Sequence, residues 1–153
     1  MMKKILLGLL VLFSFGERAG AIDIDPYWSA NVGVAMPKGW PWPGVAESVE
    51  LGAEIAKYFR LEAGMESLSF KGDQARTDIL QFSIGAQLPI GEDLKVYAGG
   101  GRKHTYGTPG IFNQAKVGIA YRIYSKQWLT LGFSNEVDRN RVSTVKLGIQ
   151  SFF

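Results

Sequence analysis

The residues that could perform chemistry are few in this sequence, and they are spread along it. Ser134 and Glu136 stand two positions apart, and the sequence contains a single histidine, His104. A serine hydroxyl becomes a nucleophile when a neighbouring base accepts its proton, and in known triads a carboxylate orients that base. His104 is the only imidazole available, and it belongs to a different predicted strand from Ser134. Hydrolysis by these three residues therefore stays an alternative, and we expect a protein that is not an enzyme.

The composition excludes several other kinds of chemistry. The sequence has no cysteine, which removes disulfides, thiol catalysis and thiolate metal sites, and one histidine leaves little material for a zinc site. The formal net charge of +3 is small, and no cluster of Lys and Arg forms a nucleic-acid footprint. Hydrophobic residues make up 46% of the 153 residues, which excludes a disordered chain. We expect one domain with no cofactor, no metal and no nucleic-acid partner.

Residues 1–21 have the features of a signal peptide. Lys3 and Lys4 form a basic start, and residues 5–15 are an eleven-residue apolar stretch. This stretch is shorter than the roughly 20 residues that cross a bilayer as a helix. Ala19-Gly20-Ala21 supplies the small residues that a signal peptidase requires. We predict cleavage after Ala21 and an exported domain of residues 22–153, with an uncleaved N-terminal anchor as the alternative.

After residue 22, apolar and polar side chains alternate with a period of two, which predicts β-strands. Turn residues interrupt this alternation and divide it into eight strands. The predicted strands are residues 27–36, 47–56, 59–69, 77–88, 94–103, 113–123, 128–136 and 142–153. One face of the strands is apolar, whereas the other face mixes glycine with long charged side chains. These charged residues are Glu50, Glu54, Glu62, Glu66, Lys95, Lys116, Arg122 and Lys146.

This pattern favours a membrane barrel. A barrel in a bilayer turns apolar residues to lipid and polar residues to its interior, and closure leaves no unpaired strand edge in hydrocarbon. The predicted fold class is therefore all-β, as an eight-stranded antiparallel up-and-down transmembrane β-barrel. Short connections alternate with longer ones, as periplasmic turns and outer loops do in such barrels. A soluble ligand-binding barrel, which would bury the apolar face, is the alternative.

We expect the charged face to fill the interior. Eight strands leave a space only wide enough for side chains, and buried ions need partners. The acids lie on the second and third strands and the bases mainly on the fifth, sixth and eighth, so the two groups can meet across the barrel. The prediction is a plug of salt bridges and hydrogen bonds. A small ion-conducting pore is the alternative, and it would require this network to open.

The outer rim is the predicted contact surface. Segment 37–44 is rich in proline and tryptophan, which suits contact with lipid headgroups or with a surface protein partner. Basic side chains near the rim could pair with the phosphates of lipopolysaccharide. We also expect aromatic belts at both membrane interfaces, with Trp128 and Phe153 in the periplasmic one. The predicted rim residues are Trp40, Trp42, Arg102, Lys103, Arg139 and Arg141.

The export signal, the eight alternating strands and the ending Lys146-Leu-Gly-Ile-Gln-Ser-Phe-Phe153 together resemble a known family. They look like the small Gram-negative outer-membrane barrels of the OmpA, OmpX and opacity-protein type. The resemblance implies export through the periplasm to the outer membrane and a structural or surface role, such as adhesion or envelope protection. It also implies that Phe153, preceded by apolar residues at alternate positions, is read by the barrel-assembly machinery. Ser151 departs from that pattern.

The step Ser134-Asn135 resembles a second family, the outer-membrane lipid A deacylases of the PagL type. Members of that family hydrolyse an acyl ester with a serine and a histidine that stands two residues earlier. The corresponding position here is Gly132, so His104 would have to replace the missing base. The resemblance therefore implies, as the alternative function, a lipid A esterase that lacks an expected residue.

Overall fold

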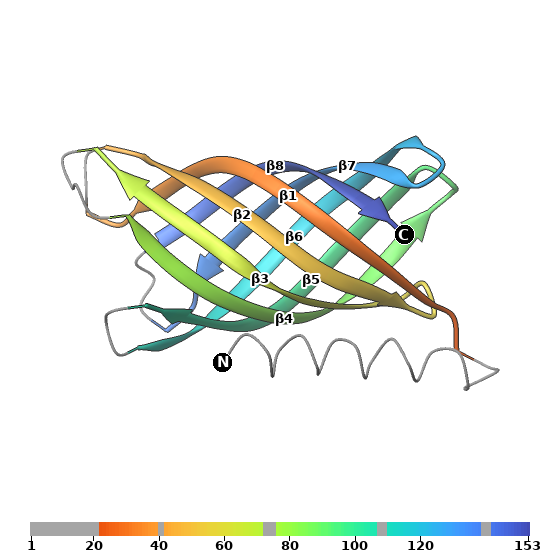
Figure 1. Cartoon of the computed structure of the whole chain (residues 1–153), viewed down its shortest axis with the longest axis horizontal. Coiled ribbons are helices and arrows are strands. Elements are labelled where there is room, and N and C mark those ends of the chain that lie inside the picture. The colour runs from red at the N-terminus through yellow and green to blue at the C-terminus, as the bar shows by residue number, and fades with distance from the viewer. Residues whose placement is uncertain (1–21, 40–41, 72–75, 107–109, 139–141) are drawn as a thin grey trace.

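The computed structural model describes residues 22–39, 42–71, 76–106, 110–138 and 142–153. They form one closed barrel in which each strand pairs antiparallel with its neighbour in sequence and β1 pairs with β8 (Figure 1). The strands are β1 (Ile24–Pro37), β2 (Gly44–Ile55), β3 (Phe59–Phe70), β4 (Thr77–Ile90), β5 (Leu94–Thr105), β6 (Ile111–Tyr124), β7 (Gln127–Glu136) and β8 (Val142–Phe152). The predicted fold class, an all-β barrel of eight antiparallel strands, is confirmed.

The alternation of the sequence places apolar side chains on the outside of the barrel. Phe82, Val117 and Leu147 are each about half exposed, at 51%, 49% and 50%. On the inner face, Glu66 and Lys103 are only 1% and 2% exposed. This distribution is the reverse of that in a soluble protein, and it is the one that a bilayer stabilises. The described residues include no helix long and apolar enough to cross a membrane.

The two ends of the barrel differ in their connections. Residues 56–58, 91–93 and 125–126 make short turns at one end, which we call the turn end. The longer connections, after β1, β3, β5 and β7, lie at the opposite loop end. β1 starts and β8 finishes at the turn end (Figure 1). Ala56 and Lys57 have φ values of 52° and 65° there, which L-residues adopt mainly in tight turns.

Two tyrosines explain part of the glycine content of the inner face. Tyr27 lies directly across from Gly52, and Tyr97 lies directly across from Gly118. A Cβ atom at either glycine would overlap the ring of its tyrosine. Glycine is therefore required at both positions because it lets the ring lie flat against the neighbouring strand.

Candidate functional site

The centre of the barrel interior is an ionic cluster around Glu62. Arg60 Nη2 lies 2.7 Å from Glu62 Oε1, and Lys116 Nζ lies 2.7 Å from Glu62 Oε2. The Tyr27 hydroxyl donates a further hydrogen bond to Oε1 at 2.7 Å. The Arg60 guanidinium also stacks on the Tyr97 ring, with its carbon 4.3 Å from the ring centroid. Two cations and a hydroxyl thus compensate one buried carboxylate, as a charge removed from water requires.

A second ionic cluster lies nearer the loop end, around Glu66. Lys103 Nζ is 2.5 Å from Glu66 Oε2, and Lys146 Nζ is 2.9 Å from Oε1. Lys146 also donates to Ser48 Oγ at 3.2 Å. Glu50 connects the two clusters, since it lies 3.3 Å from the Lys116 nitrogen and 3.9 Å from the Lys146 nitrogen. The interior is therefore one continuous network.

A third group of contacts lies toward the turn end. Lys95 Nζ is 2.6 Å from Glu54 Oε2. The same ammonium lies 4.3 Å from the centroid of the Trp128 ring and 5.1 Å from that of Phe152. Gln150 joins this group to the centre, because its amide nitrogen donates to Glu54 and its oxygen accepts from Arg60. Trp128 is buried here, so its predicted place in a lipid-facing belt is wrong.

Among the described residues, acids and bases of the interior are equal in number. All ten side chains point to the inner face and are largely shielded from solvent. The acids are Glu50, Glu54, Glu62, Glu66 and Glu136, and the bases are Arg60, Lys95, Lys103, Lys116 and Lys146. Such a balance leaves no net charge to be stabilised inside a low-dielectric wall.

The space between these side chains is small. Two voids of about 30 and 10 Å³ lie beside the central cluster. A void of this size holds a water molecule or two.

Toward the loop end, apolar side chains of β1 to β4 form a compact cluster on the inner face. They are Ala35, Ala46, Leu68 and Ile79, with Phe70 and Val142 packed against them.

Two of the predicted site residues, Lys103 and Arg122, lie in a different part of the barrel from the one predicted. Lys103 was expected at the outer rim, but the alternation of β5 turns it inward to Glu66, where it is fully buried. Arg122 was expected in the interior network, but it lies at the turn end. Its guanidinium lies 2.7 Å from Asp93 Oδ1 and 3.5 Å from Glu92 Oε2. Both acids belong to the turn before β5 and lie within reach of the long arginine side chain.

The three residues of the alternative catalytic set do not meet. Ser134 and Glu136 are buried on the inner face of β7, and Ser134 Oγ lies 2.7 Å from Thr144 Oγ1. His104 is exposed on the outer face of β5, between Leu80 and Ile111 of the neighbouring strands. The barrel wall separates the imidazole from the hydroxyl, so the structure does not bring together the three residues that the alternative function would require.

The structure describes only some of the predicted rim residues. Arg102 is exposed on the outer face of β5, opposite Phe82 and Asn113. Trp42 is exposed after β1, with Lys71 Nζ 5.2 Å from its ring centroid. Trp40, Arg139 and Arg141 lie outside the described residues, as do residues 1–21 with the predicted signal peptide. Within the described ranges, no three His, Cys, Asp or Glu side chains are grouped to hold a metal ion.

Three residues of the central cluster were not predicted from the sequence, namely Arg60, Tyr27 and Tyr97. Arg60 stands two residues before Glu62 on the same face of β3. The alternation of the sequence was therefore sufficient to predict its side chain in the barrel interior. The tyrosines were harder to recognise because aromatic residues also form interfacial belts. The signal that distinguishes them is the glycine directly across the ladder from each ring.

No protein-family model matches the sequence, and no curated protein matches it. Solved structures do match. Neisserial surface protein A is 14% identical with a TM-score of 0.64, and the match covers 87% of this chain and 99% of that one. The attachment invasion locus protein Ail of Yersinia pestis is 10% identical with a TM-score of 0.58, covering 85% and 98%.

A designed transmembrane β-barrel matches as well as the natural proteins do. It is 17% identical with a TM-score of 0.65, and the match covers 83% of this chain and 95% of the design. Because a design shares no function with the natural barrels, this likeness concerns architecture. By its fold, the chain is a small eight-stranded transmembrane β-barrel of the outer-membrane type.

Proposed function

We propose that this protein is an integral barrel of the Gram-negative outer membrane that conducts no ions and acts through its outer surface. Its role is then structural or one of surface interaction, in adhesion or in protection of the envelope. The observation that carries this proposal is the filled interior, in which Glu62 and Glu66 are each held by two cations. A charge in such a network is costly to release, because its partner would remain buried and unpaired.

The apolar groups at the two ends of the interior support the lack of conduction. Toward the loop end, Leu68 and Ile79 are almost completely buried in the apolar cluster. Toward the turn end, the rings of Trp128 and Phe152 lie against Lys95. An ion crossing the barrel would have to displace both groups and also open the ionic network between them.

The names of two structural neighbours support a role at the cell surface. One is described as a surface protein and the other as an attachment invasion locus protein. In this chain, Trp42 and Arg102 are exposed toward the loop end and could contact a partner protein or lipopolysaccharide phosphates. Phe153, exposed at the turn end, is the residue we propose the barrel-assembly machinery to read.

We propose no enzymatic activity. His104 and Ser134 lie on opposite faces of the wall, and the hydroxyl of Ser134 is hydrogen-bonded to Thr144. In the described part of the chain, Ser134 therefore has no imidazole on its side of the wall to accept its proton.

The proposal is tested by recording from the folded protein in planar lipid bilayers. We expect heat-modifiable gel mobility, which reports a closed barrel, together with a baseline current that is the same as that of the lipid alone. The variant Glu62→Ala/Glu66→Ala is the positive control, since removal of both carboxylates should loosen the interior and raise the current. Steady stepwise conductance by the wild-type barrel would contradict a plugged interior.

A further inference from the structure

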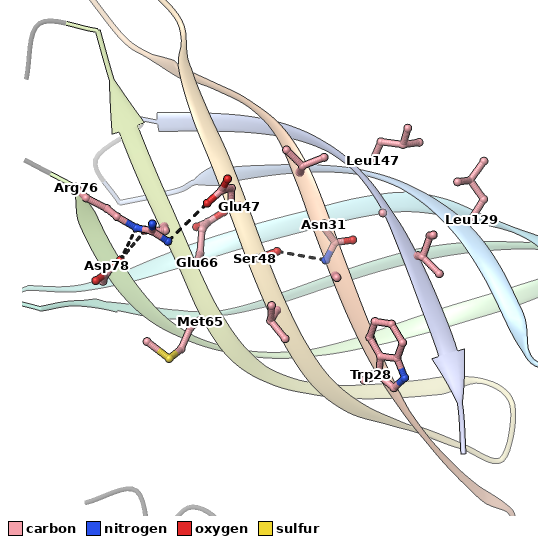
Figure 2. A pocket seen from close by; sticks show the side chains of 16 residues that line it. Trp28, Asn31, Glu47, Ser48, Met65, Glu66, Arg76, Asp78, Leu129 and Leu147 are labelled. Carbon is pink, nitrogen blue, oxygen red and sulfur yellow. Dashed lines mark hydrogen bonds and ion pairs between the residues drawn. The ribbon is translucent and has the colours of Figure 1, made fainter.

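The outer surface of the barrel is not uniformly smooth, because a groove of about 750 Å³ crosses it from β7 to β4. Figure 2 shows the side chains that line it. Since protein surfaces in contact are close-packed, a hollow of this size in a membrane must be filled by lipid or by another protein. Its outward-facing apolar residues are Trp28, Ala30, Val32, Val49, Met65, Leu129, Leu147 and Ile149.

Three charged side chains, Glu47, Arg76 and Asp78, line the part of the groove nearest the loop end (Figure 2). Arg76 Nη2 lies 3.6 Å from Glu47 Oε2, and Arg76 Nε lies 3.3 Å from Asp78 Oδ1. One cation between two carboxylates gives this group a formal charge of −1. The side chains of Arg76, Glu47 and Asp78 are 60%, 58% and 49% exposed, so the group can accept one further cation.

A cation with no carboxylate beside it stands elsewhere on the outer face, at Arg102 of β5. Its side chain is exposed, and its neighbours across the two ladders are Phe82 and Asn113, neither of which carries a charge. Within the described ranges, no acid forms an ion pair with Arg102. A basic side chain on the lipid face of a membrane barrel is costly unless a partner compensates its charge. Arg102 is therefore a candidate contact residue.

Arg102 and Glu47 lie at similar distances from the loop end. Glu47 stands three residues after Gly44, where β2 starts, and Arg102 stands three residues before Thr105, where β5 finishes. Two copies inserted into one membrane with the same orientation therefore bring these residues to the same depth. Because β2 and β5 are three strands apart around a barrel of eight, the groove and Arg102 face different directions. One copy can thus use both surfaces at once.

We propose that the groove is a docking site for a second copy of this chain, which inserts the outer face around its Arg102. The inference rests on the proposed membrane location of the barrel. The Arg102 guanidinium of one copy binds the carboxylates of Glu47 and Asp78 of the other and compensates the charge of −1. Phe82, directly across the ladder from Arg102, then packs against the apolar residues of the groove. The contact is head-to-tail, so copies assemble into rows or closed rings.

The charge of the groove favours a protein occupant over lipid. Lipopolysaccharide, which we expect around the loop end, carries phosphates that would gain Arg76 but would also face two carboxylates. A second copy instead supplies a guanidinium, which pairs with both acids and leaves the contacts of Arg76 in place. Like charges at a contact exclude the wrong partner, and opposite charges fix the register of the right one.

Cysteine cross-linking tests the proposal, because the sequence contains no cysteine of its own. Val49 is the next outward residue from Glu47 toward the turn end, and Gly100 is the next outward residue from Arg102 in the same direction. The variant Val49→Cys/Gly100→Cys, folded into lipid vesicles and oxidised, should form disulfide-linked dimers and larger species. The control pair Leu131→Cys/Gly100→Cys should give little product, since Leu131 faces outward on β7 but does not line the groove.

The single variants test the head-to-tail arrangement. Val49→Cys alone and Gly100→Cys alone should stay monomeric, because like residues do not meet and a disulfide requires close Cα atoms. A mixture of the two single variants should give dimers and nothing larger. Dimers formed by either single variant alone would indicate a two-fold contact and overturn the proposed arrangement.

The charges are tested in the background of Val49→Cys/Gly100→Cys. Arg102→Glu and Glu47→Arg should each lower the yield of cross-linked product about threefold or more, the size that one exposed ion pair supports. A mixture of these two charge variants should recover the yield, because it again offers opposite charges at the contact. Equal yields from the groove pair and the Leu131 control pair would overturn the proposal, as would no product from a folded barrel, which would leave lipid as the occupant. Failure to enter vesicles at all would instead contradict the membrane location.

Discussion

Lys103 on β5 and Glu66 on β3 face each other across the barrel interior, with Lys103 Nζ 2.5 Å from Glu66 Oε2. The two strands are not neighbours, because β4 lies between them. Lys146 of β8 reaches the other oxygen of the same carboxylate at 2.9 Å. One side chain thus joins three strands, two of which share no backbone ladder with its own. The interior ion pairs therefore connect strands across the barrel, whereas the backbone ladders connect only neighbouring strands.

Removing one partner of this pair should destabilise the barrel. Lys103→Met leaves Glu66 with a single cation, and we expect the free energy of unfolding to fall by about 3 kcal/mol. The double variant Lys103→Met/Glu66→Gln should regain part of that loss, because it leaves no uncompensated carboxylate. Urea unfolding in detergent micelles, followed by tryptophan fluorescence, measures both. A double variant less stable than the single one would contradict this account.

Adding a methyl group under the Tyr97 ring should also destabilise the barrel. Gly118→Ala places a Cβ against the Tyr97 ring and the Leu131 carbonyl oxygen, so the ring must move away from the wall and from Arg60. Overpacking of this kind costs about 1–3 kcal/mol. Gly100→Ala is the matched control, since the nearest atom to a Cβ there is 3.3 Å away on the outer face. Equal losses for the two variants in the same urea titration would show that the ring is not the cause.

A charge on the outer wall should be costly only where the wall meets hydrocarbon. Val117 lies near the middle of β6 on the outward face, and we expect Val117→Arg to lower the free energy of unfolding in lipid vesicles by about 3 kcal/mol. Val137→Arg, beyond the end of β7, should cost little. If both variants unfold like the wild type in vesicles, the apolar face does not contact lipid.

The acyl chains of lipid A should be the same with and without this protein. Ser134 is buried beside Thr144, and the imidazole of His104 lies outside the wall. Mass spectrometry of lipid A from cells that express the wild type, Ser134→Ala or neither should give one pattern. Loss of an acyl chain in the wild-type sample alone would establish an esterase and contradict the proposed function.

The sequence was sufficient to predict the architecture because alternation reports directly on which face a residue occupies. β6 was predicted at residues 113–123 and is found at Ile111–Tyr124, and β8 was predicted to begin at residue 142, as it does. The ladders extend beyond the predicted ends at several strands. At the start of β2, for example, Gly44 pairs with Ala35, although glycine and alanine carry little strand signal.

The height of each side chain along the barrel could not be predicted in the same way. Alternation places Lys103 and Arg122 on the inner face. It does not give the stagger between strands, which determines the side chains that each residue contacts. That stagger brings Lys103 level with Glu66 and carries Arg122 to the acids of the turn end. A hollow of about 750 Å³ on the outer face, lined by side chains such as Trp28, Met65 and Leu147, was missed for the same reason, since it combines residues of strands far apart in sequence.

The pairing of β1 with β8 also limits when this protein can fold. The first strand has no partner on one edge until β8 has been synthesised. A chain that stops before Val142 would keep two open edges, and each unpaired amide or carbonyl in hydrocarbon costs several kcal/mol. Closure of the barrel must therefore follow synthesis of β8, so the strands cannot enter hydrocarbon one at a time as they are made.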